Sequence, residues 1–213
     1  MNFKHFLCVL VVLAALPVVA WADDGGAGGK NYQVSFTPFG FVERMKYGSL
    51  DSKGDKQSRK IFYKSVIGGS LAKEFNLGKS ATLLELSYMH AKADKYEYLG
   101  KEYSTDGRFN DLTSVSIMYY LGKTIFPAKR FQVPIYIGVG GEVVQGYPFH
   151  HLMFDLGAKA RMKFYITRKF GVFAGVTGKW GYGHSTYGEG SSAETASHHH
   201  LSANFDAGLT FEL

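Results

Sequence analysis

The feature that most constrains this chain is a two-residue alternation of apolar and polar side chains along most of its length. The segment 201–213 shows it most clearly, with Leu, Ala and Phe at odd positions and small or polar residues at even positions. The segment 151–165 repeats it, with Leu, Phe, Ala and Met at even positions. Successive side chains of a strand point to opposite faces, so each segment predicts a β-strand with one apolar and one polar face.

Eight segments of this kind are predicted to be strands, and no helical period separates them. The eight are 33–44, 60–75, 82–89, 113–121, 131–140, 151–165, 172–180 and 201–213. In 33–44 apolar residues occur on both faces, so its orientation is ambiguous. In 60–75 Lys64 is assigned to the same polar face as Glu74. Pro38 and Pro134 each remove a ladder hydrogen bond, so a local defect is expected at both.

The connections between these strands alternate in length. The short ones are 76–79, 123–130 and 167–169. The others, which are mostly long, are 45–59, 92–110, 145–150 and 183–199. Three short turns alternating with four longer loops place both ends of the barrel chain on the short-turn side. Outer-membrane barrels are arranged in this way, with short periplasmic turns and longer extracellular loops.

Side-chain size separates a membrane barrel from a soluble barrel, which shows the same alternation. The polar face is rich in Gly, Ser and Thr, which fits the narrow interior of an eight-stranded barrel, whereas the apolar face of Leu, Ile, Val and Phe suits lipid. A mean hydropathy of −0.10 excludes a polytopic helical membrane protein. The aromatic residues expected at the membrane interfaces are Tyr32, Tyr119, Tyr165, Trp180 and Tyr182. The predicted fold is therefore all-β, an eight-stranded antiparallel up-and-down transmembrane β-barrel.

Residues 1–22 are interpreted as a cleaved secretory signal peptide. A short polar start precedes an apolar run, and Ala20 and Ala22 supply the small residues of a cleavage site. Segment 23–30 is then a flexible leader, and 31–213 is the outer-membrane β-barrel domain. Cys8 is the only cysteine, so the mature chain is predicted to contain no disulfide and no thiolate site.

The signal peptide, the eight amphipathic strands and the final strand LSANFDAGLTFEL resemble the small eight-stranded outer-membrane β-barrel family. This is the OmpA-transmembrane, OmpX and opacity-like group, and the resemblance is one of architecture. It implies a location in the outer membrane of a Gram-negative-type bacterium, with membrane lipid and lipopolysaccharide as surrounding partners. The family includes adhesins, structural barrels and lipid-modifying enzymes, so the fold alone does not fix the function.

Charged residues on the inward faces form the main candidate site. A buried charge without a partner is costly, so such residues must pair with one another. The four acids and three bases predicted to meet in the lumen are Glu85, Glu142, Asp155, Asp206, Lys159, Arg161 and Lys179. We expect them to form a salt-bridged plug, as the resemblance to small barrels implies. No catalytic, cofactor-binding or metal-binding residue is predicted.

The expected function is non-enzymatic: a structural or adhesive envelope protein whose surface loops contact something outside the cell. One alternative is a lipid-modifying enzyme similar to lipid A deacylases, because His200 and Ser202 share a strand face and a His can act as base to a Ser nucleophile. Ala203 departs from the His-x-Ser-Asn pattern of those enzymes. A second alternative is a small pore or transport accessory.

Two predicted loops form the expected contact surface. Loop 45–59 carries Lys53, Lys56 and Arg59, which suit lipopolysaccharide phosphates or another acidic surface polymer. Loop 92–110 carries several tyrosines, which suit an extracellular protein or a glycan. Nucleic acid is not an expected partner, because no basic groove interleaved with aromatic residues appears.

Histidines are concentrated in the other predicted loops. Pairs or triplets stand at 150–151 and 198–200, and His184 lies near them. They are predicted to be solvated residues of the extracellular rim, where weak, shared metal binding is an open alternative.

The mature protein is predicted to begin at Asp23, because the residues before it supply the site that signal peptidase requires. N-terminal sequencing of the protein isolated from outer membranes checks this. A sequence beginning at Met1 would contradict both the export and the barrel orientation.

Overall fold

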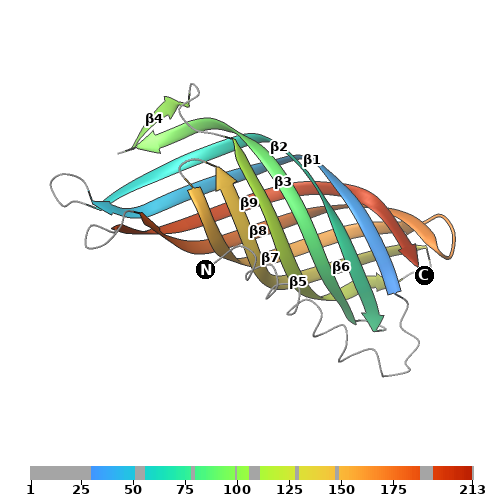
Figure 1. Cartoon of the computed structure of the whole chain (residues 1–213). Helices are drawn as coiled ribbons and strands as arrows, with labels where there is room; N and C mark the ends of the chain where they lie inside the picture. Colours follow the sequence, from blue (N-terminus) through green and yellow to red (C-terminus); the bar gives the residue numbers. More distant parts are fainter. Residues whose placement is uncertain are drawn as a thin grey trace.

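The computed structural model describes residues 30–50, 56–77, 80–98, 100–105, 111–127, 130–146, 149–187 and 194–212. They form one sheet of long, tilted strands that curls into a barrel (Figure 1). The strands are β1 (Lys30–Leu50), β2 (Lys56–Leu77), β3 (Ser80–Tyr98), β4 (Lys101–Ser104), β5 (Leu112–Pro127), β6 (Phe131–Gly146), β7 (Phe149–Tyr165), β8 (Phe170–Tyr187) and β9 (Glu194–Glu212). The predicted signal peptide, 1–22, lies outside the described residues.

Eight of these strands pair antiparallel with their neighbours and close into a ring, which confirms the predicted fold. β1 closes the ring by pairing with β9, from Asn31 opposite Glu212 to Tyr47 opposite Ser197. The short β4 lies outside the ring and, among the strands that the structure describes, pairs only with the end of β3. Closure satisfies the backbone hydrogen bonds of the edge strands, which is a requirement for strands in lipid.

The two ends of the barrel differ in their connections. We call the end that carries the connections after β2, β5 and β7 the turn end, and the opposite end the loop end. The first residues of β1 and the last of β9 lie together at the turn end, as the pairing of Asn31 with Glu212 requires. The alternation of short and long connections correctly placed these two strand ends on one side.

The predicted extents of the loops are wrong, because the strands run well past their expected ends. Most of 45–59 belongs to β1 and β2, and the connection at 145–150 shrinks to the residues between β6 and β7. Likewise 92–110 contains the end of β3 and all of β4, and 183–199 contains the ends of β8 and β9. Beyond the apolar belt a strand has no side that faces lipid, so its sequence need not alternate there. Its backbone hydrogen bonds with the neighbouring strands continue all the same.

Proline marks two of the irregularities in the ring, as predicted. At Pro38 the pairing of β1 with β9 shifts its register between Phe36 and Phe39. This bulge explains the ambiguous faces of the strand, because Phe36 and Phe39 both point outward while Val42 is buried in the lumen. The β6–β7 ladder is interrupted beside Pro134.

A second bulge corrects the predicted position of Lys64. The β2–β3 register shifts after Lys64, and Ser65 has a positive φ of 50°. The shift moves Lys64 to the outer surface, where its ammonium lies 2.7 Å from an Asp94 carboxylate oxygen. Glu74, which lies beyond the bulge, is buried in the lumen. The two residues therefore lie on opposite faces of β2.

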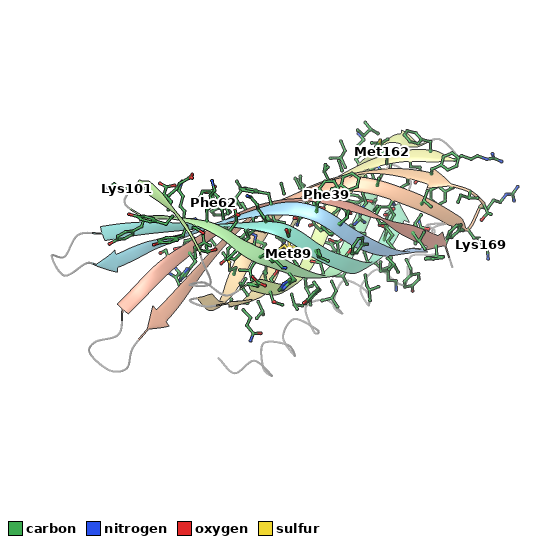
Figure 2. The ribbon with its side chains drawn as sticks, turned by 90° about the horizontal axis from the view of Figure 1, so that it is seen from above. Phe39, Phe62, Met89, Lys101, Met162 and Lys169 are labelled. Atoms are coloured by element: carbon green, nitrogen blue, oxygen red, sulfur yellow. The ribbon has the colours of Figure 1, made fainter. Side chains whose placement is uncertain are left out.

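The outer wall of the barrel is an apolar belt to which every ring strand contributes. Phe39 and Met162 lie on this wall (Figure 2), with 59% and 57% of their surface exposed. Of the predicted interfacial aromatics, Tyr32 and Trp180 are exposed on it. Tyr165 is a correction, because it is buried inside the barrel. An exposed apolar belt of this extent suits lipid.

Within the described ranges, no helix is long and apolar enough to cross a membrane.

Apolar side chains also fill parts of the interior. We call the cluster toward the loop end the apolar cap; it contains Val42, Ile61, Tyr63, Val66, Met89, Ala91, Leu112, Val144 and Met153. A second cluster covers one side of the lumen nearer the turn end, with Ala72, Ala81, Leu83, Met118, Tyr120 and Tyr136. Gly138 makes room for it, because a Cβ there would lie 2.5 Å from Cδ1 of Tyr120.

Replacing Ile137 by Arg is predicted to destabilise the membrane-inserted barrel by about 2–4 kcal/mol, because this side chain stands in the middle of the apolar belt. Ile137 is 70% exposed and pairs with Leu121 and Ala158 on the neighbouring strands. Denaturant titration in lipid vesicles measures the effect, with Ile137→Ala as the control. Leu209→Arg, near the turn end of β9, is expected to cost less. Equal stability of Ile137→Arg and wild type would contradict the lipid-facing assignment.

Candidate functional site

The strongest candidate site is the charged network inside the barrel. The structure places all seven predicted residues in the lumen, and none is more than 7% exposed. It also adds Glu74, Lys163 and His200 to them. The lysines and the arginine stand on β7 and β8, His200 stands on β9, and the carboxylates stand on β2, β3, β6, β7 and β9. Their contacts form three layers, which we call lower, central and upper from the turn end to the loop end.

The central layer is organised around Arg161. Its Nη2 atom lies 2.7 Å from Oε2 of Glu85 and 3.0 Å from Oδ2 of Asp206. Nζ of Lys159 lies 2.5 Å from Oε1 of Glu85. Thr177 donates a hydrogen bond of 3.1 Å to the second Asp206 oxygen. Arg161 therefore joins β7 to β3 and β9, neither of which is its neighbour in the ring.

The lower layer consists of an ion pair that the sequence analysis did not include in the network. Lys163 Nζ donates to Oε2 of Glu74, which also accepts hydrogen bonds from Gln33 and, at 2.8 Å, from the Tyr136 hydroxyl. Gln33 accepts in turn from Arg161, which links the lower and central layers. The sequence did contain a signal for this pair, because Glu74 and Lys163 both fall on the predicted polar faces of their strands.

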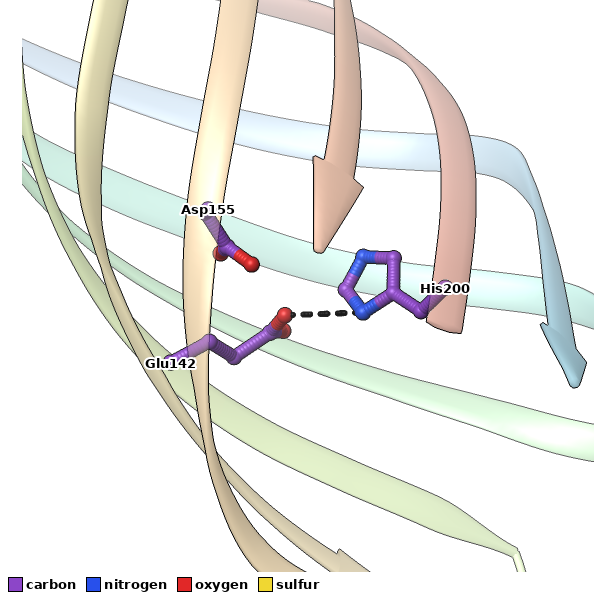
Figure 3. Close-up of side chains that lie close together, drawn as sticks. All are labelled: Glu142, Asp155 and His200. Atoms are coloured by element: carbon purple, nitrogen blue, oxygen red, sulfur yellow. Dashed lines mark ion pairs between the residues drawn. The ribbon is translucent and has the colours of Figure 1, made fainter. Parts of the chain in front are cut away.

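The upper layer contains two carboxylates, one ammonium and one imidazole. Lys179 Nζ lies 3.5 Å from Oε1 of Glu142 and 3.6 Å from Oδ2 of Asp155, and donates to Ser116 at 3.2 Å. His200 Nδ1 lies 3.1 Å from Oε2 of Glu142 (Figure 3). All the carboxylate and imidazole groups here are at most 1% exposed. The distances to Lys179 are longer than those of the ion pairs below it.

Charge is matched in two layers and unmatched in the third. The lower layer pairs one carboxylate with one ammonium, and the central layer pairs two carboxylates with two cations. In the upper layer Glu142 and Asp155 share the single ammonium of Lys179. Within the described network, the upper layer is therefore the best place for a further positive charge. That charge can lie on His200 or on a group next to His200.

A small polar cavity adjoins the central layer. Its volume is about 40 Å³, and it is lined by Ser70, Glu85, Lys159, Lys179 and Asp206, among others. A space of this size has room for a few water molecules beside the charged groups. It does not have the dimensions of a solute channel, which agrees with the small interior expected of eight strands.

The alternative catalytic pair, His200 and Ser202, points into the lumen. Both side chains are 1% exposed. The Ser202 hydroxyl has no hydrogen-bond partner among the described residues, so it makes no bond to the His200 imidazole. A lipid substrate would lie outside the wall, on the opposite face of β9. The geometry therefore does not present this pair to lipid.

The predicted loop histidines belong to strands, which corrects the sequence interpretation. His198 and His200 point into the lumen, whereas His199 and His184 lie on the outer wall. His199 contacts Tyr182 with ring centroids 5.0 Å apart, and Trp180 at 5.8 Å. This group on β8 and β9 has the aromatic character expected where a barrel meets the membrane surface. The side chains at 150–151 lie outside the described set.

Comparison with known proteins agrees with the fold. No protein-family model matches the chain, and no curated protein matches it either. The outer membrane protein OprG from Pseudomonas aeruginosa is similar in structure, with a TM-score of 0.56, 11% identity, and coverage of 88% of this chain and 99% of OprG. Neisserial surface protein A (TM-score 0.45, 11% identity, 88% and 100% covered) also matches. So does the outer membrane protease OmpT from Escherichia coli (TM-score 0.46, 11% identity, 87% and 97% covered).

The likeness to OprG establishes the fold, and at this identity it carries no residue roles. The chain has the fold of a Gram-negative outer-membrane β-barrel, as the sequence analysis predicted. Its apolar outer wall agrees with the predicted location in the outer membrane.

Arg161→Ala is predicted to destabilise the barrel by roughly 3–5 kcal/mol, because it leaves the buried carboxylates of Glu85 and Asp206 without their shared partner. Unfolding in vesicles at several denaturant concentrations gives this free energy. The control is Lys95→Ala, which removes an exposed pair with Glu102 and is expected to cost about 0–1 kcal/mol. Similar effects of the two variants would show that the network does not support the barrel.

Proposed function

We propose that this protein is a non-enzymatic outer-membrane barrel that presents a basic loop end to an acidic glycan outside the cell. The observation that carries the proposal is the filled interior. The charges of the lower and central layers are satisfied by one another, so the lumen serves as a rigid core. Function then belongs to the ends of the barrel, where side chains are accessible.

The loop end is built to hold its connections on stiff supports. β1 and β2 pair as far as Leu50 opposite Lys56, which leaves a short connection that includes Lys53. Beside it, β3 and β4 form a hairpin in which Tyr96 and Tyr103 stack with centroids 5.0 Å apart. We expect long paired strands of this kind to hold the two hairpins away from the membrane surface. They support the proposal of a protruding contact surface.

Charge favours a glycan of acidic character over an apolar protein surface as the partner. The chain carries a formal net charge of +6, and the segment 51–59 has three basic residues against two acidic ones. A basic surface raises the local concentration of a polyanion and speeds its association. Lipopolysaccharide phosphates and sulfated or uronic polysaccharides share this chemistry.

The closed interior predicts that the wild-type barrel does not conduct. Three layers of interlocked side chains and the apolar cap stand across the lumen. Recordings in planar bilayers should show no steady open-channel current. Arg161→Ala is the variant in which leak currents are expected to appear. Steady currents from the wild type would favour the pore alternative instead.

Glycan binding is tested with charge-removing variants at the two ends of the barrel. The full chain in lipid nanodiscs should bind heparin, used as a model polyanion, in a manner that weakens with salt. The triple variant Lys53→Gln, Lys56→Gln, Arg59→Gln should bind about tenfold or more weakly, since each lost ion pair contributes up to about 1 kcal/mol.

The matched control removes the same number of charges from the turn end, with Arg130→Gln, Arg168→Gln and Lys169→Gln. These three residues are exposed. The control variant should bind like the wild type. If both triple variants bound heparin equally weakly, the loss would be explained by net charge alone. That result would contradict a contact surface at the loop end.

A further inference from the structure

The upper layer holds a three-residue cluster with the composition of a metal site. Glu142, Asp155 and His200 each offer one ligand atom, and these atoms all lie within 4.8 Å of one another (Figure 3). The three residues come from β6, β7 and β9 and are 0–1% exposed. Two carboxylate oxygens and one imidazole nitrogen form a donor set that suits zinc and similar divalent ions.

Gly181 opens the space between two of these side chains. It stands on β8 directly opposite Asp155 on one side and His200 on the other. A Cβ at this position would lie 2.5 Å from Oδ1 of Asp155 and 3.4 Å from Nδ1 of His200. The absence of a side chain at Gly181 therefore creates a cradle that the two ligand atoms face.

The carboxylate of Asp155 lacks the contacts that its burial demands. It is fully buried, and neither of its oxygens has a hydrogen-bond partner among the described residues. Its ion pair with Lys179, at 3.6 Å, is longer than the 2.5–3.0 Å pairs of the central layer. A buried carboxylate in this condition gains most from a cation bound directly to it.

We propose that Glu142, Asp155 and His200 bind one divalent transition-metal ion, with Zn²⁺ as the ion that fits best. Ligand atoms around tetrahedral zinc are about 3.4 Å apart at bond lengths of about 2.1 Å, so small side-chain movements bring this cluster to bonding distance. Val144 and Met153, of the apolar cap, follow the ligands along β6 and β7 toward the loop end. They separate the ion from water at that end and strengthen its binding to the carboxylates.

Lys179 acts as the competing cation in this site. Its ammonium holds Glu142 and Asp155 when no metal is bound, and it already donates to the hydroxyl of Ser116. A bound divalent ion repels the ammonium and leaves it with the Ser116 contact. Removing the charge at Lys179 is therefore expected to tighten metal binding, by about tenfold or more for a neighbouring charge in a buried setting.

The test measures zinc retained by the full chain. Urea-denatured protein is refolded into detergent with Zn²⁺, dialysed against metal-free buffer, and analysed by elemental mass spectrometry. The wild type should retain one zinc ion per chain. The double variant Glu142→Gln, Asp155→Asn should retain none, and the control His199→Ala, which alters the outward-facing neighbour of His200, should retain one.

Two further variants keep the test decisive when the double variant does not fold. Gly181→Ala places a methyl group in the cradle and should lower zinc affinity at least tenfold, while Lys179→Gln should raise it. The proposal would be overturned if the wild type retained no zinc or if His199→Ala lost its zinc. It would also be overturned if Gly181→Ala bound zinc as tightly as the wild type. Weaker zinc binding in Lys179→Gln would also overturn it, because removing the charge of a competing cation should tighten zinc binding.

Discussion

The structure depends on one constraint: charges enclosed in a narrow barrel must be neutralised by other side chains. Arg161 illustrates how this is achieved, because it reaches Glu85 on β3 and Asp206 on β9 across the lumen. Such contacts connect strands that the backbone ladder does not connect, so they fix the cross-section of the barrel. Removing Arg161 leaves the buried carboxylate of Asp206 without an ion pair among the described residues, and the penalty for this is larger than the benefit of an exposed ion pair.

The balance of charge in the lumen changes from the turn end to the loop end. The lower and central layers are matched and form a closed core. In the upper layer two carboxylates share the ammonium of Lys179, and it is the layer next to the apolar cap. The interior therefore combines a region that serves stability with a region suited to binding a cation. The contact surface proposed for the loop end is separate from both and depends on the barrel for rigid support.

Alternation predicted the eight strands of the ring, their order and most of their faces, because lipid outside and a polar lumen inside impose a strict period of two. The prediction failed where the alternation is interrupted or does not apply. The bulge in β2 switches which residues face outward, so the alternation did not show that Lys64 lies on the outer surface. Pairing across the lumen depends on strand stagger and tilt, which local sequence does not encode. For this reason the sequence indicated that Glu85 and Arg161 face inward. It did not show that Glu74 pairs with Lys163, or that His200 contacts Glu142.

Whether buried ion pairs between distant strands support the barrel can be measured at the lower layer. A double-mutant cycle with Glu74→Gln and Lys163→Met, measured as free energy of unfolding in lipid vesicles, isolates the interaction of this pair. We expect a coupling energy of roughly 1–3 kcal/mol, because each residue is costly to bury without the other. Single effects that add to within about 0.5 kcal/mol would contradict it.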